Sequence, residues 1–512
     1  MAQTLLSVSV SNKLKKDAAL VFLLWEKETL SDGLLWRTLT TEERKYLLIP
    51  AITDQLKTRK GDSTVLTLPG TGRRVIIAGL GVRSGNIAKE TKAAAMGIRV
   101  VVQTARREHI ARIACEAGTA PTAALTADIY EVCAANAVMA NFVYDEYKTP
   151  VPSAPEPLAE IQFAVLKDLS KEQLAAMKDG IRRGLVIGEE TNACRRLQNV
   201  PGGDMTPDIL AKHAQKTAMR LGRPVRATIF GVPEMKKLGM GGVLGVGKGS
   251  AIPPRFIILE YMAGAKDERP VVLIGKGVTF DTGGLNLKGS DHIYEMHMDM
   301  SGGAAVIHAL AAAARLGVKK NIVALVPAVE NMPSGSSYRP GDLLRTMNGK
   351  TIEILNTDAE GRVILSDALE YAKKYDPSLV VDVATLTGAA MAALGLRYTG
   401  LFTPDKELEE KFRALGDAVV DPVWPLPLSE DYEGDIKGTF ADWANAGKPG
   451  VGGGASTAAT FLWQFTKDAK GEQSYPWVHL DIAPRMTSIE EEHLAKGGLG
   501  TPVRLLARFL EK

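Results

Sequence analysis

Hydrophobic and polar positions follow two periods along the chain, and the two periods alternate from one end to the other. Within residues 1–170, short apolar runs with strand periodicity predict β-strands at 5–11, 18–26, 73–81 and 161–167. Apolar residues at every third or fourth position predict helices at 88–108 and 126–147. This alternation predicts a small N-terminal α/β domain over residues 1–170.

A proline-rich run at 148–158 has the composition of a linker. A strand pattern follows it at once, and that strand needs a sheet to join. We therefore interpret the run as a surface loop inside the first domain. The long helical pattern that starts at residue 171 predicts a connecting helix over 171–194, followed by a second domain over 195–512.

The same alternation continues in the second domain. Strand patterns at 270–277, 321–329 and 378–386 are separated by helical patterns at 302–317 and 363–375. Asn348-Gly349 also predicts a β-hairpin. This order predicts a mostly parallel central sheet flanked by helices, so the expected fold class is α/β with a larger C-terminal domain. In such folds the site lies at the carboxyl ends of the strands.

Composition favours a globular protein and argues against a disulfide-stabilised one. Charged residues make up 24% of the 512 residues and hydrophobic residues 45%, which is typical of a soluble globular protein. The net charge of +3 does not indicate nucleic acid or membrane as a partner. The three cysteines form no CxxC pair, and the chain begins without a signal-peptide pattern. We therefore expect a cytoplasmic protein without a disulfide scaffold.

Two weaker motifs have simpler interpretations. The stretch GGVLGVGKGS at 241–250 nearly matches a phosphate-binding loop, but Gly249 stands where a hydroxyl should hold magnesium. We interpret it as a glycine-rich turn. His297, two residues before Asp299, is a possible metal ligand, although a polar histidine at a helix entry is the simpler interpretation. No G-x-S-x-G elbow supports a serine hydrolase.

The strongest chemical pattern is a set of carboxylates and cations around predicted strand ends and helix starts. Its members are Lys276, Asp281, Lys288, Asp299, Asp358, Glu360 and Arg362. A helix cap explains Asp299 or Asp358 taken singly. It does not explain Asp281 in a glycine-rich turn, or Glu360 and Arg362 beside Asp358. We therefore expect one cleft to collect these side chains.

Four carboxylates brought together would raise one another's pKa values unless cations compensate them. Two divalent cations would supply that charge, and oxygen-rich sites without cysteine suit magnesium, manganese or zinc. Paired metals bridge a water and make it a nucleophile near neutral pH. A lysine joins such a site only as a neutral amine, a form that neighbouring cations and burial favour.

Five motifs occur in an order that resembles the leucyl aminopeptidase family, the cytosol aminopeptidases of peptidase family M17. NTDAEGR at 356–362 is similar to the family's signature. The others are GKGVTFDTGG at 275–284, ENMPSGSSYRPGD at 330–342, DVATLTGA at 382–389 and HLDIA at 479–483. The resemblance covers roughly 195–512 and is dense over 271–390.

The resemblance implies a metallo-exopeptidase that removes leucine and other N-terminal residues from peptides with a free N-terminus. A hydroxide bridging two metal ions, manganese or zinc, would attack. One ion would be held by Asp281, Asp358 and Glu360, and the other by Lys276, Asp281, Asp299 and Glu360.

By the same resemblance, Lys288 and Arg362 match the two catalytic positions, and Arg362 can hold a bicarbonate that carries a proton. Met296 and Gly388 would contribute to the pocket for the first side chain. The family also implies a homohexamer.

Two alternatives come from other functional classes. Paired carboxylates also serve a di-metal phosphatase or nuclease. The hexamer could also have a DNA-binding or regulatory role, in addition to or instead of catalysis. The preferred N-terminal residue, the physiological metal and any separate binding role of the N-terminal domain are left open by the sequence.

Overall fold

The computed structural model describes residues 6–512 apart from 55, 57, 58, 118, 119, 121, 152, 167 and 168. The chain divides into two units, Met1–Asn192 with Ser488–Lys496, and Ala193–Thr487 with Gly497–Lys512. Helix α5 (Lys171–Gln198) starts where the connecting helix is predicted, and the change of unit falls within it. The predicted division does not include the short segment Ser488–Lys496, which leaves the second unit and belongs to the first.

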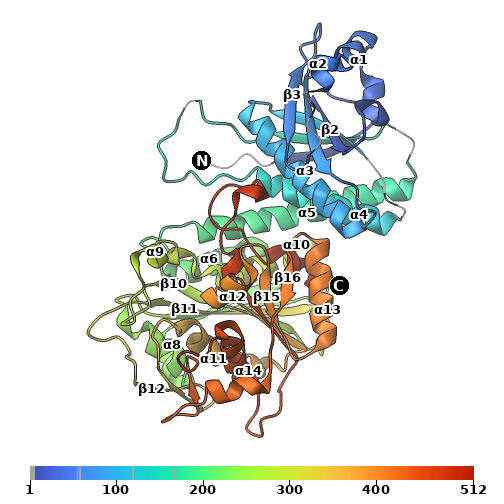
Figure 1. Ribbon diagram of the computed structural model, residues 1–512. Helices are drawn as coiled ribbons and strands as arrows, with labels where there is room; N and C mark the ends of the chain where they lie inside the picture. Colours follow the sequence, from blue (N-terminus) through green and yellow to red (C-terminus); the bar gives the residue numbers. More distant parts are fainter. Residues whose placement is uncertain are drawn as a thin grey trace. The chain divides into compact units, whose positions relative to one another are not determined.

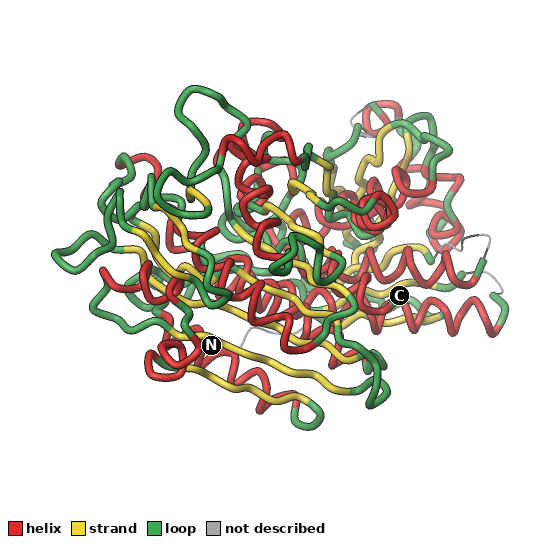
Figure 2. Tube along the Cα trace, turned by 90° about the horizontal axis from the view of Figure 1, so that it is seen from below, coloured by secondary structure: helices red, strands yellow, loops and turns green. Residues whose placement is uncertain are grey.

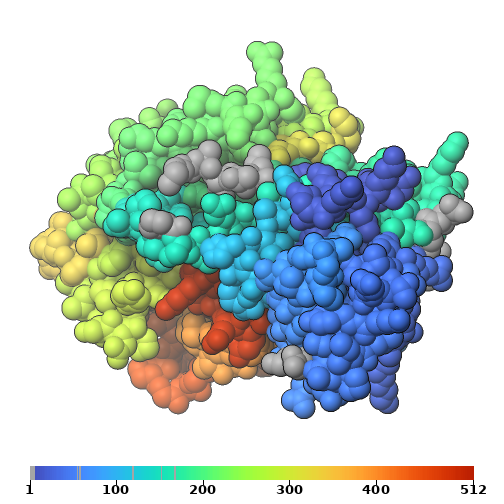
Figure 3. Space-filling view, turned by 90° about the horizontal axis from the view of Figure 1, so that it is seen from above, coloured from blue at the N-terminus to red at the C-terminus, as the bar shows by residue number. Residues whose placement is uncertain are grey.

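In the described part of the chain, six strands form the sheet of the first unit, in the order β1–β6–β5–β2–β4–β3. Their bounds are β1 (Ser7–Ser11), β2 (Ala19–Trp25), β3 (Ser63–Thr67), β4 (Arg74–Gly81), β5 (Arg112–Glu116) and β6 (Glu160–Ala164). All neighbours pair in parallel except β3 and β4. Since β6 joins β1 and β5, the proline-rich run lies inside the first unit, as predicted. In space-filling representation, the blue and cyan residues of this unit form one continuous body (Figure 3).

The helices of the first unit are α1 (Thr41–Leu47), α2 (Pro50–Thr53), α3 (Ile87–Arg107), α4 (Ala123–Ala140) and the first part of α5. The predicted helix at 88–108 is confirmed as α3. The helix predicted over 126–147 ends earlier, at Ala140, because the Asn141 side chain ties the chain to Leu158 instead. Its amide donates to the Leu158 carbonyl at 2.9 Å and accepts from the Leu158 N–H at 2.7 Å.

Close packing of α4 against α5 depends on glycines spaced four residues apart on α5. A Cβ atom on Gly180 would lie 2.1 Å from the carbonyl oxygen of Ala127, and one on Gly184 would lie 2.3 Å from that of Glu131. Any side chain larger than hydrogen would therefore push the two helices apart.

The larger sheet lies in the second unit, with the order β16–β15–β18–β14–β9–β11–β8–β7 and with β10 paired to the end of β11. Its strands are β7 (Val225–Phe230), β8 (Arg255–Met262), β9 (Val271–Gly275), β10 (Gly277–Asp281), β11 (Asn321–Asn331), β14 (Leu379–Ala384), β15 (Thr399–Phe402), β16 (Val423–Pro425) and β18 (Trp477–Asp481). The centre from β18 to β11 is parallel, and antiparallel pairs flank it. The predicted mostly parallel sheet is confirmed.

A small separate sheet contains the hairpin predicted at Asn348-Gly349. Strands β12 (Leu343–Arg345) and β13 (Thr351–Glu353) pair antiparallel across it, and β17 (Trp443–Ala444) runs parallel to β13.

Helices cover both faces of the larger sheet (Figures 1 and 2). One layer contains α6 (Pro207–Leu221), α10 (Ser301–Leu316), α13 (Lys406–Ala418) and α15 (Val503–Glu511). The other contains α7 (Val232–Leu238), α8 (Gly241–Val246), α11 (Glu360–Ala372) and α14 (Gly454–Thr466). Two short helices, α9 (Ser290–Ile293) and α12 (Gly388–Leu394), lie in loops. Among the described residues, no helix combines the length and apolarity needed to cross a lipid bilayer.

The glycine-rich stretch at 241–250 is not the turn that we predicted. It forms α8 and a 3-10 turn at Gly247–Gly249. The N–H of Val243 donates to Asp367 Oδ2 on α11 at 2.9 Å, so a carboxylate of the chain itself takes this amide. The same carboxylate accepts the N–H of Met347 through Oδ1 at 2.8 Å, and Asp367 therefore joins α8, α11 and the hairpin loop.

We expect Asp367→Asn to lower the free energy of unfolding by about 1–3 kcal/mol, since one buried amide donor would then face an NH₂ group. Denaturant titration measures this.

Burial raises the pKa of Asp367 from 3.8 to about 7, despite the opposing amide hydrogen bonds. Because the folded state favours the protonated carboxyl group, protonation of Asp367 contributes to the free energy of unfolding. This contribution is complete below pH 3.8 and is lost as the pH rises to about 7. The variant should lack that part of the pH dependence.

The exposed Asp267 provides the control, because Asp267→Asn should change the free energy of unfolding by less than about 0.5 kcal/mol. An Asp367→Asn variant as stable as this control would show that the carboxylate does not hold the three segments together.

Candidate metal centre

Two of the predicted site residues, Lys276 and Asp281, lie at the carboxyl ends of strands in the larger sheet. Lys276 directly follows β9, Asp281 is the last residue of β10, and Asn331 is the last residue of β11. Thr385 directly follows β14. The site therefore lies at the sheet edge where it is expected for a parallel α/β fold.

Lys276 interrupts the strand that would otherwise continue from β9 into β10. Its N–H donates to the carbonyl of Val383 at 2.9 Å, and its own carbonyl accepts the N–H of Gly303 at 2.7 Å. The N–H thus extends the pairing of β9 with β14, whereas the carbonyl bonds to α10, and β10 beyond it pairs with β11. The Lys276 side chain is almost completely buried.

The Lys276 ammonium group lies close to three oxygen atoms, two from carboxylates and one from a backbone carbonyl. Nζ lies 2.9 Å from Asp299 Oδ2, 2.7 Å from Glu360 Oε1 and 2.9 Å from the carbonyl oxygen of Thr385. A Cβ on Gly361 would lie 2.8 Å from this nitrogen. Gly361, which lies between Glu360 and Arg362, therefore leaves the space in which Lys276 reaches the carboxylates.

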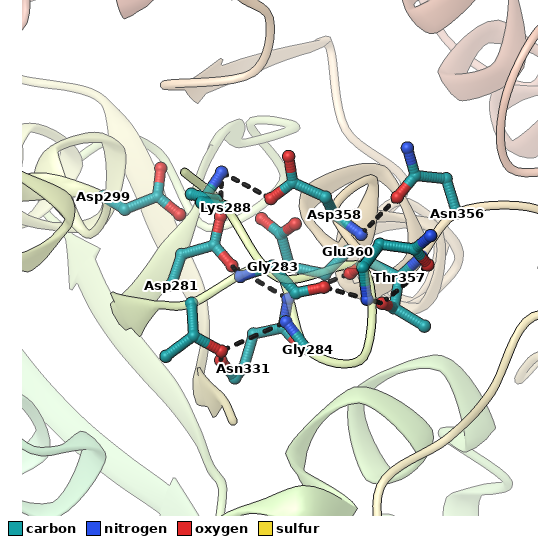
Figure 4. Close-up of polar contacts among 12 residues, drawn as sticks. Asp281, Gly283, Gly284, Lys288, Asp299, Asn331, Asn356, Thr357, Asp358 and Glu360 are labelled. Carbon is teal, nitrogen blue, oxygen red and sulfur yellow. Dashed lines mark hydrogen bonds and ion pairs between the residues drawn. The ribbon is translucent and has the colours of Figure 1, made fainter. Parts of the chain in front are cut away.

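Lys288 connects two other carboxylates of the cluster (Figure 4). Its Nζ lies 2.8 Å from Asp281 Oδ2 and also contacts Asp358 Oδ1. The second oxygen of Asp281, Oδ1, accepts the N–H of Gly283 and the side-chain amide of Asn331, both at 2.8 Å. The two oxygens of Asp281 therefore have different partners.

Helix α11 begins at Glu360, three residues before the start predicted at Val363. Glu360 and Arg362 consequently lie in its first turn, and Asp358 lies in the turn before it, where its N–H donates to Asn356 Oδ1 at 2.8 Å. One carboxylate oxygen each from Asp281, Asp358 and Glu360 lies within 4.8 Å of the others. This group can surround a cation.

Burial and charge act against each other in the cluster. Burial raises the pKa of Asp299 and Glu360, and Lys276 opposes the rise in both. Burial of Lys276 disfavours its charged form, but Asp299, Glu360 and Asp281 together raise its pKa above the ordinary value. The pKa of Lys288 is raised in the same way, because Asp281, Glu360 and Asp358 outweigh its burial.

Unsatisfied polar atoms show what the cluster can accept. Among the described residues, no group forms a hydrogen bond with the buried Glu360 Oε2. With the oxygens of Asp281 and Asp358 close to it, the donor set is oxygen-rich, which fits a divalent cation. The buried Arg362 Nε likewise has no hydrogen-bond partner within the part of the chain that the structure describes. Burial lowers the pKa of Arg362 to about 10, while Glu360 and Asp481 oppose this, so the side chain is cationic at neutral pH and fits an anion.

Sequence reasoning assigned no role to Thr385 and Asp481, although both lie inside quoted motifs. The Thr385 hydroxyl donates to Asp299 Oδ1 at 2.6 Å. Asp481 accepts the N–H of Leu386 at 3.1 Å and the hydroxyl of Thr387 at 2.7 Å, and it thereby holds the turn that carries Thr385. Their position inside these motifs was the only feature of the sequence that could have indicated a role for them.

Three further predicted positions lie outside this cluster. Met296 is half-buried in a 3-10 helix, Met296–Met298, and Gly388 is the exposed first residue of α12. Their role in a pocket stays a prediction. His297 lies beside Met296, and burial lowers its pKa. It is not part of the group formed by the three carboxylates.

Comparison with known proteins identifies the family. Residues 192–507 match the model of the cytosol aminopeptidase family, catalytic domain. A probable cytosol aminopeptidase of Nitrosococcus oceani is 37% identical over 498 residues, which cover 97% of this chain and 96% of the relative. A second, from Nitrosospira multiformis, is 43% identical over 367 residues, which cover 72% of this chain and 68% of the relative.

A similar fold occurs in the solved structure of the bottromycin maturation enzyme BotP in complex with Mn. It superposes with a TM-score of 0.79 at 31% sequence identity and covers 97% of this chain and 99% of that chain.

Thr385→Val should destabilise the protein without added metal by about 1.5–3 kcal/mol, because a buried carboxylate loses a hydrogen-bond donor. Denaturant unfolding measures the loss. Thr279→Val is the matched control, because the buried Thr279 hydroxyl donates to a neutral carbonyl, that of Val329, at 3.3 Å. It should lose only about 1 kcal/mol. Equal losses in the two variants would show that the charge on Asp299 adds nothing to its bond with Thr385.

Proposed function

Because the chain belongs to the cytosol aminopeptidase family and is an aminopeptidase of the hydrolase class, we propose that it removes N-terminal residues from peptides at the acidic cluster of β10 and α11. The observation that carries this proposal is the convergence of Asp281, Asp358 and Glu360 inside the region that matches the family. Leucine is the first residue to test, and other residues with a free α-amine are further substrates.

The proposed metal ligands form two overlapping sets. Asp281, Asp358 and Glu360 would hold one ion, and Lys276, Asp281, Asp299 and Glu360 the other. Manganese and zinc both suit these donors, and the complex of the related BotP structure with Mn favours manganese for the first test. When bound, two such ions would neutralise the carboxylates, polarise the scissile carbonyl and lower the pKa of a water molecule.

Lys276 has a specific requirement in this proposal. As an ammonium group it donates a hydrogen bond to the carbonyl of Thr385 and forms ion pairs with Asp299 and Glu360. As a ligand it must lose one proton, and nearby cations would favour that loss because they reverse the effect of the carboxylates on its pKa. Gly361 leaves room for the lysine at this position.

Lys288 is suited to act on the substrate. It comes from a loop rather than from a strand, its side chain is 14% exposed, and its ammonium group lies between Asp281 and Asp358. We assign it the role of donating a hydrogen bond to the carbonyl oxygen of the scissile bond, where negative charge develops in the transition state.

Arg362 is suited to hold an anion beside the reaction. It is buried and cationic, and no described residue forms a hydrogen bond with its Nε. A bicarbonate held by this guanidinium would carry a proton from the attacking water to the leaving amine. Arg362 itself stays charged and supplies the anchor.

Further parts of the proposal rest on the family resemblance. They are a first-residue pocket that includes Met296 and Gly388, assembly as a homohexamer, and a cytoplasmic location. The comparisons lend no support to a phosphatase or nuclease activity or to a DNA-binding role.

We expect a strong chelator to abolish the hydrolysis of leucine p-nitroanilide, and added Mn²⁺ or Zn²⁺ to restore it. N-acetylated leucine p-nitroanilide should not be cleaved, because an amide nitrogen cannot serve as a metal ligand as an amine does. Release of nitroaniline measures both. p-Nitrophenyl phosphate is the control substrate for the phosphatase alternative. Efficient cleavage of the acetylated substrate would reject the aminopeptidase proposal.

Lys288→Ala should lower kcat roughly 100- to 1000-fold, about 3–4 kcal/mol, because one preorganised donor to the transition state is removed. KM and the metal content of the purified variant should change little. Lys319→Ala, at an exposed position, is the control and should change kcat by less than about twofold. A fully metallated Lys288→Ala enzyme with normal kcat would remove Lys288 from the mechanism.

A further inference from the structure

Asn331 joins the two segments that carry the carboxylates, yet the proposed mechanism gives it no role. It is the last residue of β11 and is fully buried. Its side-chain NH₂ group donates to Asp281 Oδ1 at 2.8 Å and to the carbonyl oxygen of Thr357 at 2.9 Å. Figure 4 shows Asn331 beside Asp281, with Thr357 and Asp358 on the neighbouring turn.

Chemistry fixes the orientation of this amide. A flipped side chain would place Asn331 Oδ1 against the Asp281 carboxylate and the Thr357 carbonyl, and all three groups are acceptors. In the observed orientation both amide protons are used. Within the described residues, Oδ1 of Asn331 accepts no hydrogen bond. The NH₂ group, and not the oxygen, of Asn331 must therefore face Asp281 and the Thr357 carbonyl.

The hydrogen bonds of Asn331 make the two oxygens of Asp281 unequal. Oδ1 accepts two neutral donors, the amide of Asn331 and the N–H of Gly283. Oδ2 faces the Lys288 ammonium group. One oxygen is thus tied to the protein frame, and the other points toward the cations of the cluster.

The second amide proton acts on the turn before α11. Thr357 directly precedes Asp358, and its carbonyl accepts hydrogen bonds from Asn331 and from the hydroxyl of Tyr338 at 2.7 Å. Asn331 therefore bonds to both the segment of Asp281 and the segment of Asp358 and Glu360, which are also joined directly by the hydrogen bond from the Thr357 hydroxyl to the Gly283 carbonyl at 2.6 Å.

We propose that Asn331 is a positioning residue that turns Asp281 so that Oδ2 is the oxygen presented to a divalent cation. This inference rests on the proposed function, since it assigns the geometry of that metal centre. Asn331 acts only through Asp281 and the Thr357 carbonyl. Outer partners of this kind typically contribute 10- to 100-fold to metal affinity when they orient a ligand.

Tyr338 offers a matched control. Its hydroxyl donates to the same carbonyl of Thr357 but makes no hydrogen bond to Asp281. Tyr338→Phe removes one donor from the turn and leaves Asp281 as it is. Asn331→Leu, of similar size to asparagine, removes the donors to both. Any difference between the two variants in metal binding then reports on Asp281.

The experiment is calorimetric titration of the metal-free full-length chain with MnCl₂, with thermal unfolding of each protein as the check on folding. Asn331→Leu should weaken Mn²⁺ binding by about 10- to 100-fold. Tyr338→Phe should stay within about threefold of the wild type. Asn331→Ala is the second variant and should match Asn331→Leu.

Other outcomes would overturn the inference. Equal weakening in Asn331→Leu and Tyr338→Phe would show that Asn331 acts only through the Thr357 turn. Unchanged binding in Asn331→Leu would remove its role altogether, and unfolding of both Asn331 variants would make that role one of stability alone. A wild-type chain that takes up no Mn²⁺ or Zn²⁺ would overturn the proposed metal centre itself, which separates that failure from the failure of Asn331.

Discussion

The concentration of negative charge at the end of the central sheet is the constraint on which the rest of the site depends. Asp281, Asp299 and Glu360 are buried almost completely and lie around one lysine or the other. Uncompensated carboxylates at such a place would be very costly. Lys276 and Lys288 supply compensating charge from within the chain, and divalent cations would supply it in the proposed active state. The interrupted strand at Lys276 and the missing side chain at Gly361 both serve this compensation.

Uncharged hydrogen-bond donors orient the carboxylates that the lysines compensate. Thr385 donates to Asp299 and Asn331 to Asp281, so each carboxylate has one oxygen held by an uncharged group and one oxygen facing a lysine. The charge attraction between a carboxylate and an ammonium group or a metal ion depends little on direction. A hydrogen bond from a hydroxyl or an amide, in contrast, constrains the angle at which the carboxylate oxygen is held. The lysines therefore balance the charge of the carboxylates, and the neutral donors fix their orientation.

The alternation of strand and helix patterns predicted the α/β fold correctly, because buried parallel strands are nearly continuous apolar runs. It also predicted which sheet edge carries Lys276 and Asp281. Features set by distant contacts were not predictable. The helix at 126–147 ends early because Asn141 pairs with Leu158, and the glycine-rich stretch is helical where Asp367 takes its amide. Asn331 stood in a quoted motif, but its partners Asp281 and Thr357 lie on other segments.

The segment Ser488–Lys496 has a consequence for any attempt to divide the protein. An antiparallel bridge between Thr487 and Gly498 closes its base in the second unit. Within the first unit, Arg99 donates to the carbonyl of Glu492 at 3.0 Å, and Leu494 packs against the core cluster. A shortened chain of residues 193–512 would keep this segment and lose its partners, which would leave Leu494 facing water. No single cut therefore releases either unit intact, and removal of residues 1–192 also requires that residues 488–496 be replaced by a short link between 487 and 497.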